Sequence, residues 1–363
     1  MIVIFGAGII GLFIAKKLLE NKKKVLVFDT SDVSANATSA SIGMLAPLIE
    51  TKPYENQLLS LMMDSKKLWD KEFKQRKLAN LIGLKKNFSL LIAKDLDELE
   101  EIKFKKQFIS RIGFETNILS KKETLRIEPN LNSNIEGSLF FNEHNQVEPK
   151  PLKLFLKRSI LNMGGIIKKR QNLERFNFVN NILKIDELKF TAEKLIICCG
   201  AWSNKLLEKS LNISFPMRPV KGVSMIFKTE TNMFKNNLWF KKIYLAPRKG
   251  KKLAVGATED EKGFEEEVTL DEIFFLSKHL WESLPELEKL KYQEVKAGLR
   301  STVIDGHPII GELKHNKNII CSFGHHRHGI LLGPITAKIV MDYVLEKKIP
   351  NKYCFFSPKR FNL

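Results

Sequence analysis

Short apolar runs and glycines alternate over the first part of the chain. Ile2–Phe5 is fully apolar and leads into Gly6–Gly11, in which glycine stands at the first, third and sixth positions. An amphipathic stretch follows, and a second apolar run, Val25–Phe28, ends at Asp29. This order predicts a strand, a glycine turn, a helix and a second strand that ends in an acid, which is the pattern of a dinucleotide-binding βαβ unit.

Each part of this predicted turn has a physical task. Gly6 allows the tight turn off the strand, Gly8 lets the backbone approach a pyrophosphate, and Gly11 lets helix and strand pack closely. The helix N-terminus presents unpaired N–H groups to phosphates. Asp29, eighteen residues beyond Gly11, is spaced to accept hydrogen bonds from a ribose hydroxyl. Both FAD and NAD are compatible with this pattern.

The rest of the chain alternates helical and extended patterns. Apolar residues at three- and four-residue steps, and a capping box at Thr269 and Glu272, predict helices over residues 54–78, 95–112, 152–163, 270–284 and 335–345. Short apolar runs predict strands at 88–93, 195–199, 224–227, 243–245, 253–256 and 318–323, and short strands and turns between 173 and 185. Residues 324–333 are expected to form a loop.

Elements of the nucleotide-binding type are thus expected at the start, middle and end of the chain, with β-rich material inserted between them. The apolar run from Leu195 ends at Gly200 and enters a helix, so it resembles a second strand at the edge of a nucleotide site. Between Thr30 and Pro47 the chain carries small side chains and hydroxyls, which backbone running close beside a flat ligand requires. The pattern predicts an α/β fold.

Composition is that of a globular protein with more than one domain. The chain has 363 residues, of which 44% are hydrophobic and 28% charged, and two domains are expected. The apolar start has no positive n-region, so it is interpreted as the first strand and not as a signal peptide. No run approaches the about 18 apolar residues of a spanning helix. Four cysteines without metal spacing suit buried thiols in a reducing compartment, so a cytoplasmic location is expected.

The net charge of +19 has three readings: a nucleic acid partner, an anionic membrane surface, or a lysine-rich composition. Composition is favoured because lysines occur in scattered short clusters such as Lys22–Lys24 and Lys347–Lys348. We therefore expect no nucleic acid partner, and peripheral contact with a membrane stays open.

Together these motifs carry a resemblance that extends over nearly the whole chain. The chain resembles the D-amino-acid oxidase family of flavoproteins, most closely its glycine oxidase branch, which serves thiazole synthesis in thiamine formation. The motifs that carry the resemblance are Gly6–Gly11, Ala37–Pro47, Gln146–Pro149, Cys199–Ser203, Pro219–Gly222, Tyr244–Arg248, Val255–Thr258, Ala297–Arg300 and Gly324–Leu331. The last two of these motifs are the most specific.

The resemblance implies a Rossmann-like FAD-binding domain interleaved with an antiparallel-sheet α+β substrate domain. The FAD-binding domain would comprise residues 1–85, 146–215 and 297–363, and the substrate domain residues 86–145 and 216–296. FAD would be bound noncovalently, because no cysteine precedes Arg300 and no histidine follows Ala37–Ser41, where related enzymes attach it.

The resemblance also assigns positions along the cofactor. The pyrophosphate would lie at Gly6, Gly8, Ile9, Ile10 and Gly11, the adenosine ribose at Asp29 and Thr30, and the adenine at the backbone of Leu173. The ribityl chain and flavin ring would lie along Ala37, Thr38, Ile42, Gly43 and Met44, with Gly200 at the second strand edge. The pyrimidine edge would be wrapped by His325, His326, Arg327, His328, Gly329, Ile330 and Leu331. Backbone N–H groups at a helix entrance would stabilise the negative charge of the reduced ring.

Arg300 and Arg327 match the substrate-carboxylate anchors of the family, with Tyr244 and Met44 in the same pocket. An arginine fork binds a carboxylate through two parallel hydrogen bonds and orients the α-carbon. The alternative for each arginine is a surface salt bridge. Ile42 is bulkier than the alanine typical there, and His326 and His328 replace other residues, so the pocket is expected to be reshaped.

The expected reaction is oxidation of glycine or another small amine. A hydride leaves the α-carbon for the flavin, the imine hydrolyses to a 2-oxo acid and ammonia or passes to thiazole synthase, and O2 gives hydrogen peroxide. Because flavin and positioning carry this step, no side chain is expected to act as catalytic acid or base. Alternatives are a D-amino-acid or sarcosine dehydrogenase that uses quinone, an enzyme that oxidises a modified tRNA base, and a flavin-binding subunit of a larger dehydrogenase.

Other prominent residues have structural interpretations. The histidines at 325, 326 and 328 lack a carboxylate or cysteine at ligand spacing, so no metal is expected. Lys221 and Arg248 are expected to be structural residues at strand ends, and Cys198 and Cys199 core residues. A homo-oligomer is expected.

Overall fold

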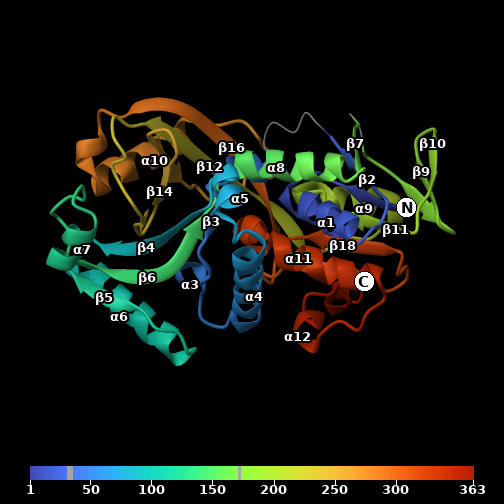
Figure 1. The fold of residues 1–363 in the computed structure, drawn as a ribbon, viewed down its shortest axis with the longest axis horizontal. Coiled ribbons are helices and arrows are strands. Elements are labelled where there is room, and N and C mark those ends of the chain that lie inside the picture. Colours follow the sequence, from blue (N-terminus) through green and yellow to red (C-terminus); the bar gives the residue numbers. More distant parts are fainter. Residues whose placement is uncertain (31–35, 171–172) are drawn as a thin grey trace.

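Two large sheets lie side by side along the long axis of the molecule (Figure 1). The computed structural model describes residues 1–30, 36–170 and 173–363. Residues 31–35, part of the small-residue stretch expected to follow a flat ligand, lie outside the described residues. The mixed α/β architecture confirms the predicted fold class.

The six-stranded sheet contains the predicted N-terminal βαβ unit. Its order is β17-β18-β11-β1-β2-β7, and all neighbours are parallel except β17 and β18. The strands are β1 (Ile2–Phe5), β2 (Val25–Asp29), β7 (Ile166–Lys169), β11 (Lys194–Ile197), β17 (Ile309–Glu312) and β18 (Ile319–Phe323). Because the inner strands are covered on both faces, their sequences are continuous apolar runs.

Alternate residues of β1 enter two different cores. Ile2 and Ile4 pack with the helices α1 (Ile9–Glu20), α4 (Asn56–Glu72), α8 (Pro149–Asn162) and α11 (Gly329–Val344). Val3 and Phe5 face the helix α9 (Ser203–Leu211) and the three-stranded sheet β10-β9-β8. That small sheet consists of β8 (Asn177–Val179), β9 (Ile182–Ile185) and β10 (Leu188–Thr191).

The nine-stranded sheet is mostly antiparallel. Its order is β16-β12-β15-β14-β13-β4-β6-β3, with β5 also paired to β6, and β4 and β13 form the parallel pair. The strands are β3 (Met44–Leu45), β4 (Lys85–Ala93), β5 (Asn117–Ser120), β6 (Gly137–Gln146), β12 (Met217–Lys228), β13 (Asn237–Trp239), β14 (Tyr244–Arg248), β15 (Lys252–Gly256) and β16 (Lys291–Val303). The long pair β12 and β16 sets Val220 opposite Arg300.

The remaining helices flank the sheets or connect them. They are α2 (Ala37–Ala40), α3 (Pro47–Glu50), α5 (Arg76–Leu81), α6 (Leu96–Arg111), α7 (Lys121–Ile127), α10 (Leu270–Ser283) and α12 (Asn351–Cys354), with 3-10 turns η1 (Gly200–Trp202), η2 (Pro285–Leu287), η3 (His326–His328) and η4 (Pro358–Phe361). The predicted capping box at Thr269 and Glu272 is present at the start of α10. The proposed division of the chain into FAD-binding and substrate domains stays a prediction.

The helix predicted over residues 54–78 is wrong in its length. Helix α4 ends at Glu72, and the chain resumes as α5 only at Arg76. Phe73, which follows α4, is buried and stacks on Trp69 with ring centroids 4.7 Å apart. The helix therefore ends where this ring enters the core.

The loop predicted over residues 324–333 is also wrong, because α11 already begins at Gly329 and continues through Pro334. A proline inside a helix disrupts the backbone hydrogen bonds around it. Here α4 compensates: Ser65 Oγ and Trp69 Nε1 donate to the Leu331 carbonyl at 2.5 and 3.0 Å, and Ile335 N donates to Ser65 Oγ at 3.4 Å. Tertiary contacts thus support a helix that local sequence argues against.

Candidate active site

A cavity of about 510 Å³ opens at the carboxyl ends of the parallel strands. Residues at or just beyond the ends of β1, β2, β11 and β18 line it, among them Gly6, Asp29, Gly200 and Gly324. In open parallel sheets this is the edge at which ligands bind. The location agrees with the dinucleotide site expected from the N-terminal βαβ unit.

The glycine turn leaves no room for side chains on its protein side. Gly6 has a φ of +101°, and a Cβ there would stand 2.3 Å from the Cys198 carbonyl oxygen. A Cβ at Gly11 would stand 2.0 Å from the Gly6 carbonyl oxygen, so strand and helix approach each other as only glycine permits. A Cβ at Gly8 would meet only Thr38 Oγ1, at 3.9 Å. Gly8 therefore keeps open backbone toward the cavity.

The N-terminus of α1 faces the same space. Gly8, Ile9 and Ile10 line the cavity, and Ile9 N donates to Thr38 Oγ1 at 3.1 Å. This bond ties the first turn of α1 to α2, which brings Ala37 and Thr38 to the cavity wall. The other N–H groups of the first helical turn have no partner within the helix, so this end suits an anionic group.

Most residues expected to hold the cofactor lie around this cavity. Those that line it are Gly6, Gly8, Ile9, Ile10, Asp29, Thr30, Ala37, Thr38, Leu173, Gly200, His325, His326 and Gly329. Those outside its lining are Gly11, Ile42, Gly43, Met44, Arg327, His328, Ile330 and Leu331. Ile330 and Leu331 are in α11 and pack in the core with α1 and α4.

Several lining residues were not identified from the sequence. Among them are Cys198, Cys199, Trp202, Glu266 and Ser301. Cys198 and Cys199 could have been found from their position at the end of a buried parallel strand. Glu266 lies in the segment before α10, and Ser301 lies in β16. No local sequence pattern predicts that these two residues line the cavity.

Arg300 lies flat on the neighbouring strand β12. A Cβ at Gly222 would stand 2.3 Å from Arg300 Nη2, so the guanidinium occupies the space that glycine leaves. Nη1 donates to the carbonyls of Lys221 and Thr258 at 3.2 and 3.0 Å. Arg300 has no ion pair with any residue of the described ranges. Its guanidinium is therefore oriented by backbone carbonyls of β12 and of Thr258.

The Tyr244 side chain is close enough to Arg300 for the arginine charge to affect its pKa. Its ring stacks on Trp239 with centroids 4.6 Å apart, and Met44 and Ile42 pack in the same apolar cluster. Burial raises the pKa of Tyr244, even though the charge of Arg300 opposes the shift. The hydroxyl thus keeps its proton and is able to donate a hydrogen bond.

Arg327 is occupied by a carboxylate that the sequence did not single out. Arg327 Nε lies 3.9 Å from Glu50 Oε2, and His328 Nδ1 lies 2.9 Å from the same oxygen. Burial alone would raise the pKa of Glu50, but the contacts with His328 and Arg327 outweigh it and bring the pKa below its usual range. Glu50 is therefore an ionised partner, with a side chain only 11% exposed, that distinguishes Arg327 from Arg300.

The cavity and the part of the site that contains Arg300 and Arg327 meet at His326. This residue lines the cavity, and its Nε2 lies 3.2 Å from Glu259 Oε1. The contact with His326 is the main cause that lowers the pKa of Glu259 to about 2, with Arg300 and Arg327 adding to it. The site thus combines two arginines and two carboxylates beside the dinucleotide cavity.

The three histidines have different partners. His325 Nε2 lies 3.0 Å from Thr336 Oγ1, His326 contacts Glu259, and His328 contacts Glu50. Burial lowers the pKa of His325 to about 3, so this imidazole is neutral. The three histidine side chains therefore make three separate contacts between the 324–333 segment and other residues.

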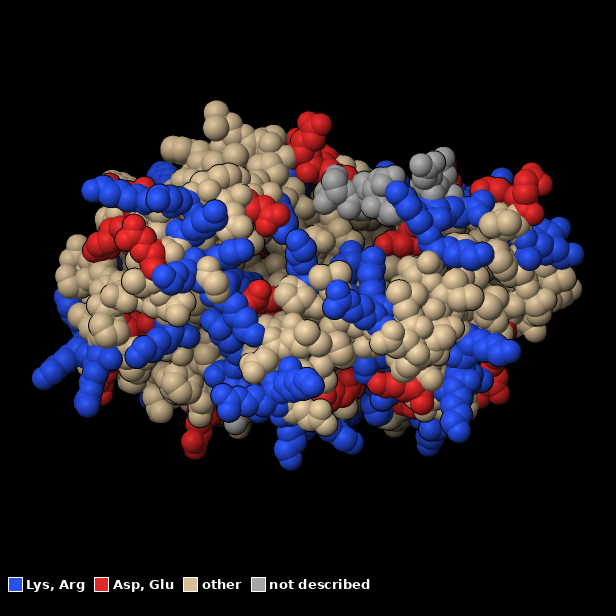
Figure 2. All heavy atoms as spheres, turned by 45° about the horizontal axis from the view of Figure 1, so that its top comes forward, with Lys and Arg blue, Asp and Glu red and all other residues tan. Residues whose placement is uncertain are grey.

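Positive charge is scattered over the face of the molecule seen in Figure 2. Lys and Arg side chains stand in separate groups between other residues, with Asp and Glu side chains among them. This distribution agrees with a lysine-rich composition rather than one basic stripe. None of the helices in the described ranges has the length and hydrophobicity that crossing a membrane requires.

Comparisons with known proteins agree with this geometry. Glycine oxidase of Geobacillus kaustophilus is 26% identical over 354 residues, which cover 96% of this chain and 93% of that protein. The bifunctional protein ThiO/ThiG of Trichormus variabilis is 28% identical over 375 residues, 99% of this chain and 55% of that protein.

Solved structures show the same fold. The crystal structure of glycine oxidase from Geobacillus kaustophilus superposes with a TM-score of 0.90 at 25% identity, over 98% of this chain and 97% of that one. Iminodiacetate oxidase from Chelativorans sp. BNC1 shares the fold with a TM-score of 0.88 at 19% identity, over 99% of both chains. A family model described as FAD dependent oxidoreductase matches residues 1–343. The chain therefore belongs to this family of FAD-dependent oxidoreductases, as its resemblance to the D-amino-acid oxidases predicted.

Proposed function

We propose that this protein oxidises glycine or another small amino acid with FAD as cofactor. The observation that carries the proposal is the Arg300 guanidinium, which is held by backbone carbonyls beside Tyr244 and has no carboxylate partner among the described residues. The similarity to glycine oxidases supports the same conclusion.

The cavity residues fit a flavin dinucleotide. The open backbone at Gly8 and the N-terminus of α1 suit a pyrophosphate, and Asp29 at the end of β2 suits ribose hydroxyls. Leu173 would lie at the adenine, and Ala37, Thr38 and His325 toward the flavin. No residue that attaches flavin covalently is required by this arrangement.

Arg300 and Tyr244 would bind the substrate. Because both hydrogen bonds of Arg300 to described residues start from Nη1, Nε and Nη2 are left for a carboxylate. The protonated Tyr244 hydroxyl would donate a further hydrogen bond. These contacts would fix the α-carbon relative to the cavity, which converts binding energy into orientation.

When bound, FAD supplies an acceptor for the hydride of the substrate α-carbon and returns the two electrons to O2. The amine enters as the free base, and water converts the imine that results. For glycine the balance is glycine, O2 and water to glyoxylate, ammonia and hydrogen peroxide. No side chain has to act as acid or base in the oxidation itself.

Arg327 would have a different task. Since Glu50 already contacts Arg327 and His328, the Arg327 guanidinium would close the substrate site and would not bind the substrate carboxylate by itself. Met44 and Ile42 would limit the size of the substrate site, which favours small substrates.

A place in thiamine thiazole synthesis is a finer proposal. It is supported by the similarity to bifunctional ThiO/ThiG, of which this chain spans about half. In that case the imine would be passed to a thiazole synthase before hydrolysis. A homo-oligomer remains part of the same proposal.

The test is anaerobic mixing of the FAD-loaded protein with glycine, sarcosine, D-alanine and D-proline, followed through the absorbance of oxidised flavin. We expect glycine to bleach the flavin, and air to restore it with formation of peroxide. Restoration by a quinone analogue but not by O2 would identify a dehydrogenase instead. Failure of all four amines would contradict the proposal and favour a larger substrate such as RNA, for which salt-dependent tRNA binding is the check.

A further inference from the structure

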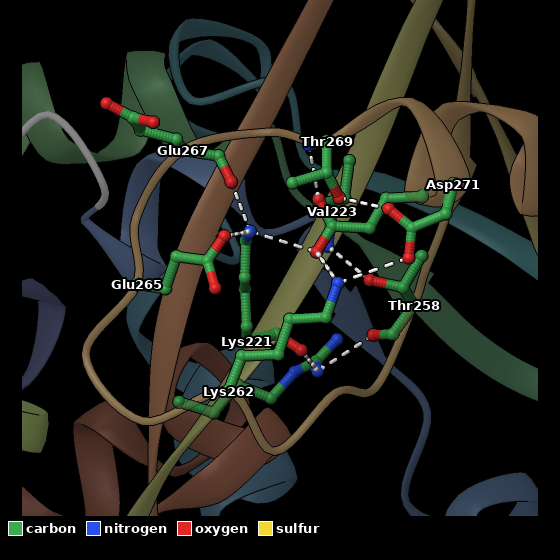
Figure 3. A network of polar contacts seen from close by, with 10 residues as sticks. Lys221, Val223, Thr258, Lys262, Glu265, Glu267, Thr269 and Asp271 are labelled. Carbon is green, nitrogen blue, oxygen red and sulfur yellow. Dashed lines mark hydrogen bonds and ion pairs between the residues drawn. The ribbon is translucent and has the colours of Figure 1, made fainter.

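Lys221 is a buried cation in the middle of β12, and the expectation that it stands at a strand end is wrong. Its side chain is 0% exposed, and Nζ lies 2.9 Å from Oε1 of Glu272, which is 1% exposed. Nζ also donates to the Glu267 carbonyl and lies 4.0 Å from the Glu265 carboxylate (Figure 3). Residues 257–269 form the segment between β15 and α10. The Lys221 ammonium thus contacts three oxygen groups, two near the end of this segment and one on α10.

The backbone of Lys221 holds the start of the same segment. Lys221 N donates to the Asp260 carbonyl at 2.8 Å, and Asp260 N donates to the Lys221 carbonyl at 3.0 Å. Residue 221 therefore fastens the 257–269 segment to β12 at both ends, by its backbone near the start and by its side chain near the end.

This segment reaches the site at several points. Glu259 contacts His326, Glu266 lines the cavity, and the Phe264 ring lies 6.0 Å from that of Trp202. Its position relative to β12 therefore affects the substrate side and the cofactor side together.

Arg300 joins the strand to the segment. Its Nη1 donates to the carbonyl of Lys221 on β12 and to the carbonyl of Thr258 in the segment. Thr258 is itself held by Val223 N, which donates to Thr258 Oγ1 at 3.0 Å (Figure 3). The two carbonyls orient the guanidinium only while the segment lies against β12.

Stability alone does not explain a buried pair of charges here. Replacing a buried ion pair by apolar residues of similar volume is often neutral or stabilising, because desolvation offsets the attraction. The pair instead specifies one position of the segment, since only that position gives the ammonium its acceptors.

We propose that the Lys221–Glu272 ion pair positions Arg300 for the substrate carboxylate by holding the 257–269 segment on β12. The inference rests on the proposed function of Arg300. Lys221 touches no substrate and is a positioning residue.

The test uses Lys221→Met in the full-length, FAD-loaded protein. Two quantities are measured: KM and kcat for glycine, and the Kd of acetate from its perturbation of the oxidised flavin spectrum. We expect KM and the acetate Kd to rise together by about tenfold, with kcat changed less than about twofold, because carboxylate binding is lost and not the chemistry. Lys221→Arg, which keeps the charge, should restore both quantities in part.

Lys194→Met is the matched control. Lys194 is a second buried lysine that pairs with a glutamate, Glu312, at 3.1 Å, and it lies on β11 at the end of the sheet opposite the cavity. It should lower the melting temperature as Lys221→Met does while leaving KM and the acetate Kd unchanged. Should Lys221→Met fail to fold, Glu272→Gln removes the charge but keeps an acceptor for the Thr269 N–H, and it should shift the same two quantities.

The outcomes separate this inference from the proposed function. If glycine does not reduce the flavin, the proposed substrate is wrong, but a higher acetate Kd in Lys221→Met still supports the positioning role. If glycine is oxidised and both Lys221→Met and Glu272→Gln keep the KM and the acetate Kd of the parent, the positioning role is wrong. If acetate does not perturb the parent spectrum, Arg300 is not presented to the cavity and the inference is overturned.

Discussion

The dinucleotide cavity and the arginine site beside it are built in different ways. The cavity opens at the carboxyl ends of parallel strands, and its glycine turn lies within one short segment of chain. The arginine site consists of Tyr244, Arg300, Glu50, Arg327 and Glu259, whose side chains come together from β14, β16, α3, η3 and the 257–269 segment. The glycine turn depends on the absence of side chains, and the arginine site depends on charged side chains whose partners are far away in the chain. Substitutions should therefore damage the two regions in distinguishable ways.

The largest effect on the fold and on FAD binding together is expected for Gly11→Ala. The added Cβ would stand 2.0 Å from the Gly6 carbonyl oxygen, and since backbone is in the way, strand and helix must separate at a loss of about 3 kcal/mol. We expect a protein that binds little FAD and melts at a lower temperature, as measured by flavin content and thermal unfolding.

Gly164→Ala is the control for this substitution. Gly164 has a φ of +80° but no neighbour within 4 Å of an added Cβ, so only backbone strain of about 1 kcal/mol is expected. Equal loss of FAD in both variants would contradict the steric explanation.

Arg300→Ala should affect the second region alone. Removing the charged partner of a carboxylate weakens binding by about 2 to 5 kcal/mol, so KM for glycine should rise steeply while FAD stays bound. Arg158→Ala, which removes an exposed arginine of α8 far from the 257–269 segment in the chain, should leave KM unchanged. Normal turnover of Arg300→Ala at low glycine would exclude Arg300 from the site.

Gly222→Ala sharpens the comparison with Gly11→Ala. Here the added Cβ would meet the end of a flexible side chain, Arg300 Nη2 at 2.3 Å, so the guanidinium can move while the fold is kept. We expect KM to rise by about tenfold with little change in melting temperature or flavin content. A large drop in melting temperature without a change in KM would show that Arg300 does not need its present position.

The smallest effect is expected for Glu259→Gln and depends on pH. The contact with His326 lowers the pKa of Glu259 to about 2, so the folded state binds the proton less tightly than the unfolded chain. The carboxylate therefore stabilises the fold above about pH 4.5 and loses that contribution as the pH falls toward 2.

Because the Glu259 side chain is 55% exposed, solvent screening should keep this contribution below about 1 kcal/mol. Melting temperatures of parent and Glu259→Gln should differ most above about pH 4.5 and converge as the pH falls toward 2. A constant difference across this range would mean that the charge of Glu259 is not involved.

The sequence was sufficient where structure is local. The strand, glycine turn and helix of the N-terminal unit, the acid at position 29 and the capping box of α10 each depend on neighbours a few residues away, and all were predicted. The same holds for β18, whose apolar run follows from burial on both faces of a parallel sheet.

Other features were decided only by tertiary contacts. The first turns of α11 form across Pro334 because Ser65 and Trp69 satisfy the Leu331 carbonyl. Glu50 could not be recognised from its own segment, since its partners Arg327 and His328 are far away in the chain.

The sequence by itself determined that the chain contains a dinucleotide-binding unit, that an arginine stands in the Ala297–Arg300 motif, and which family it resembles. Only the tertiary structure decided which of Arg300 and Arg327 has a carboxylate partner among the described residues, and how each guanidinium is oriented. The physical reason is that glycine geometry and strand periodicity act within one segment, whereas the environment of a charge is set by groups converging from β12, the 257–269 segment and α3.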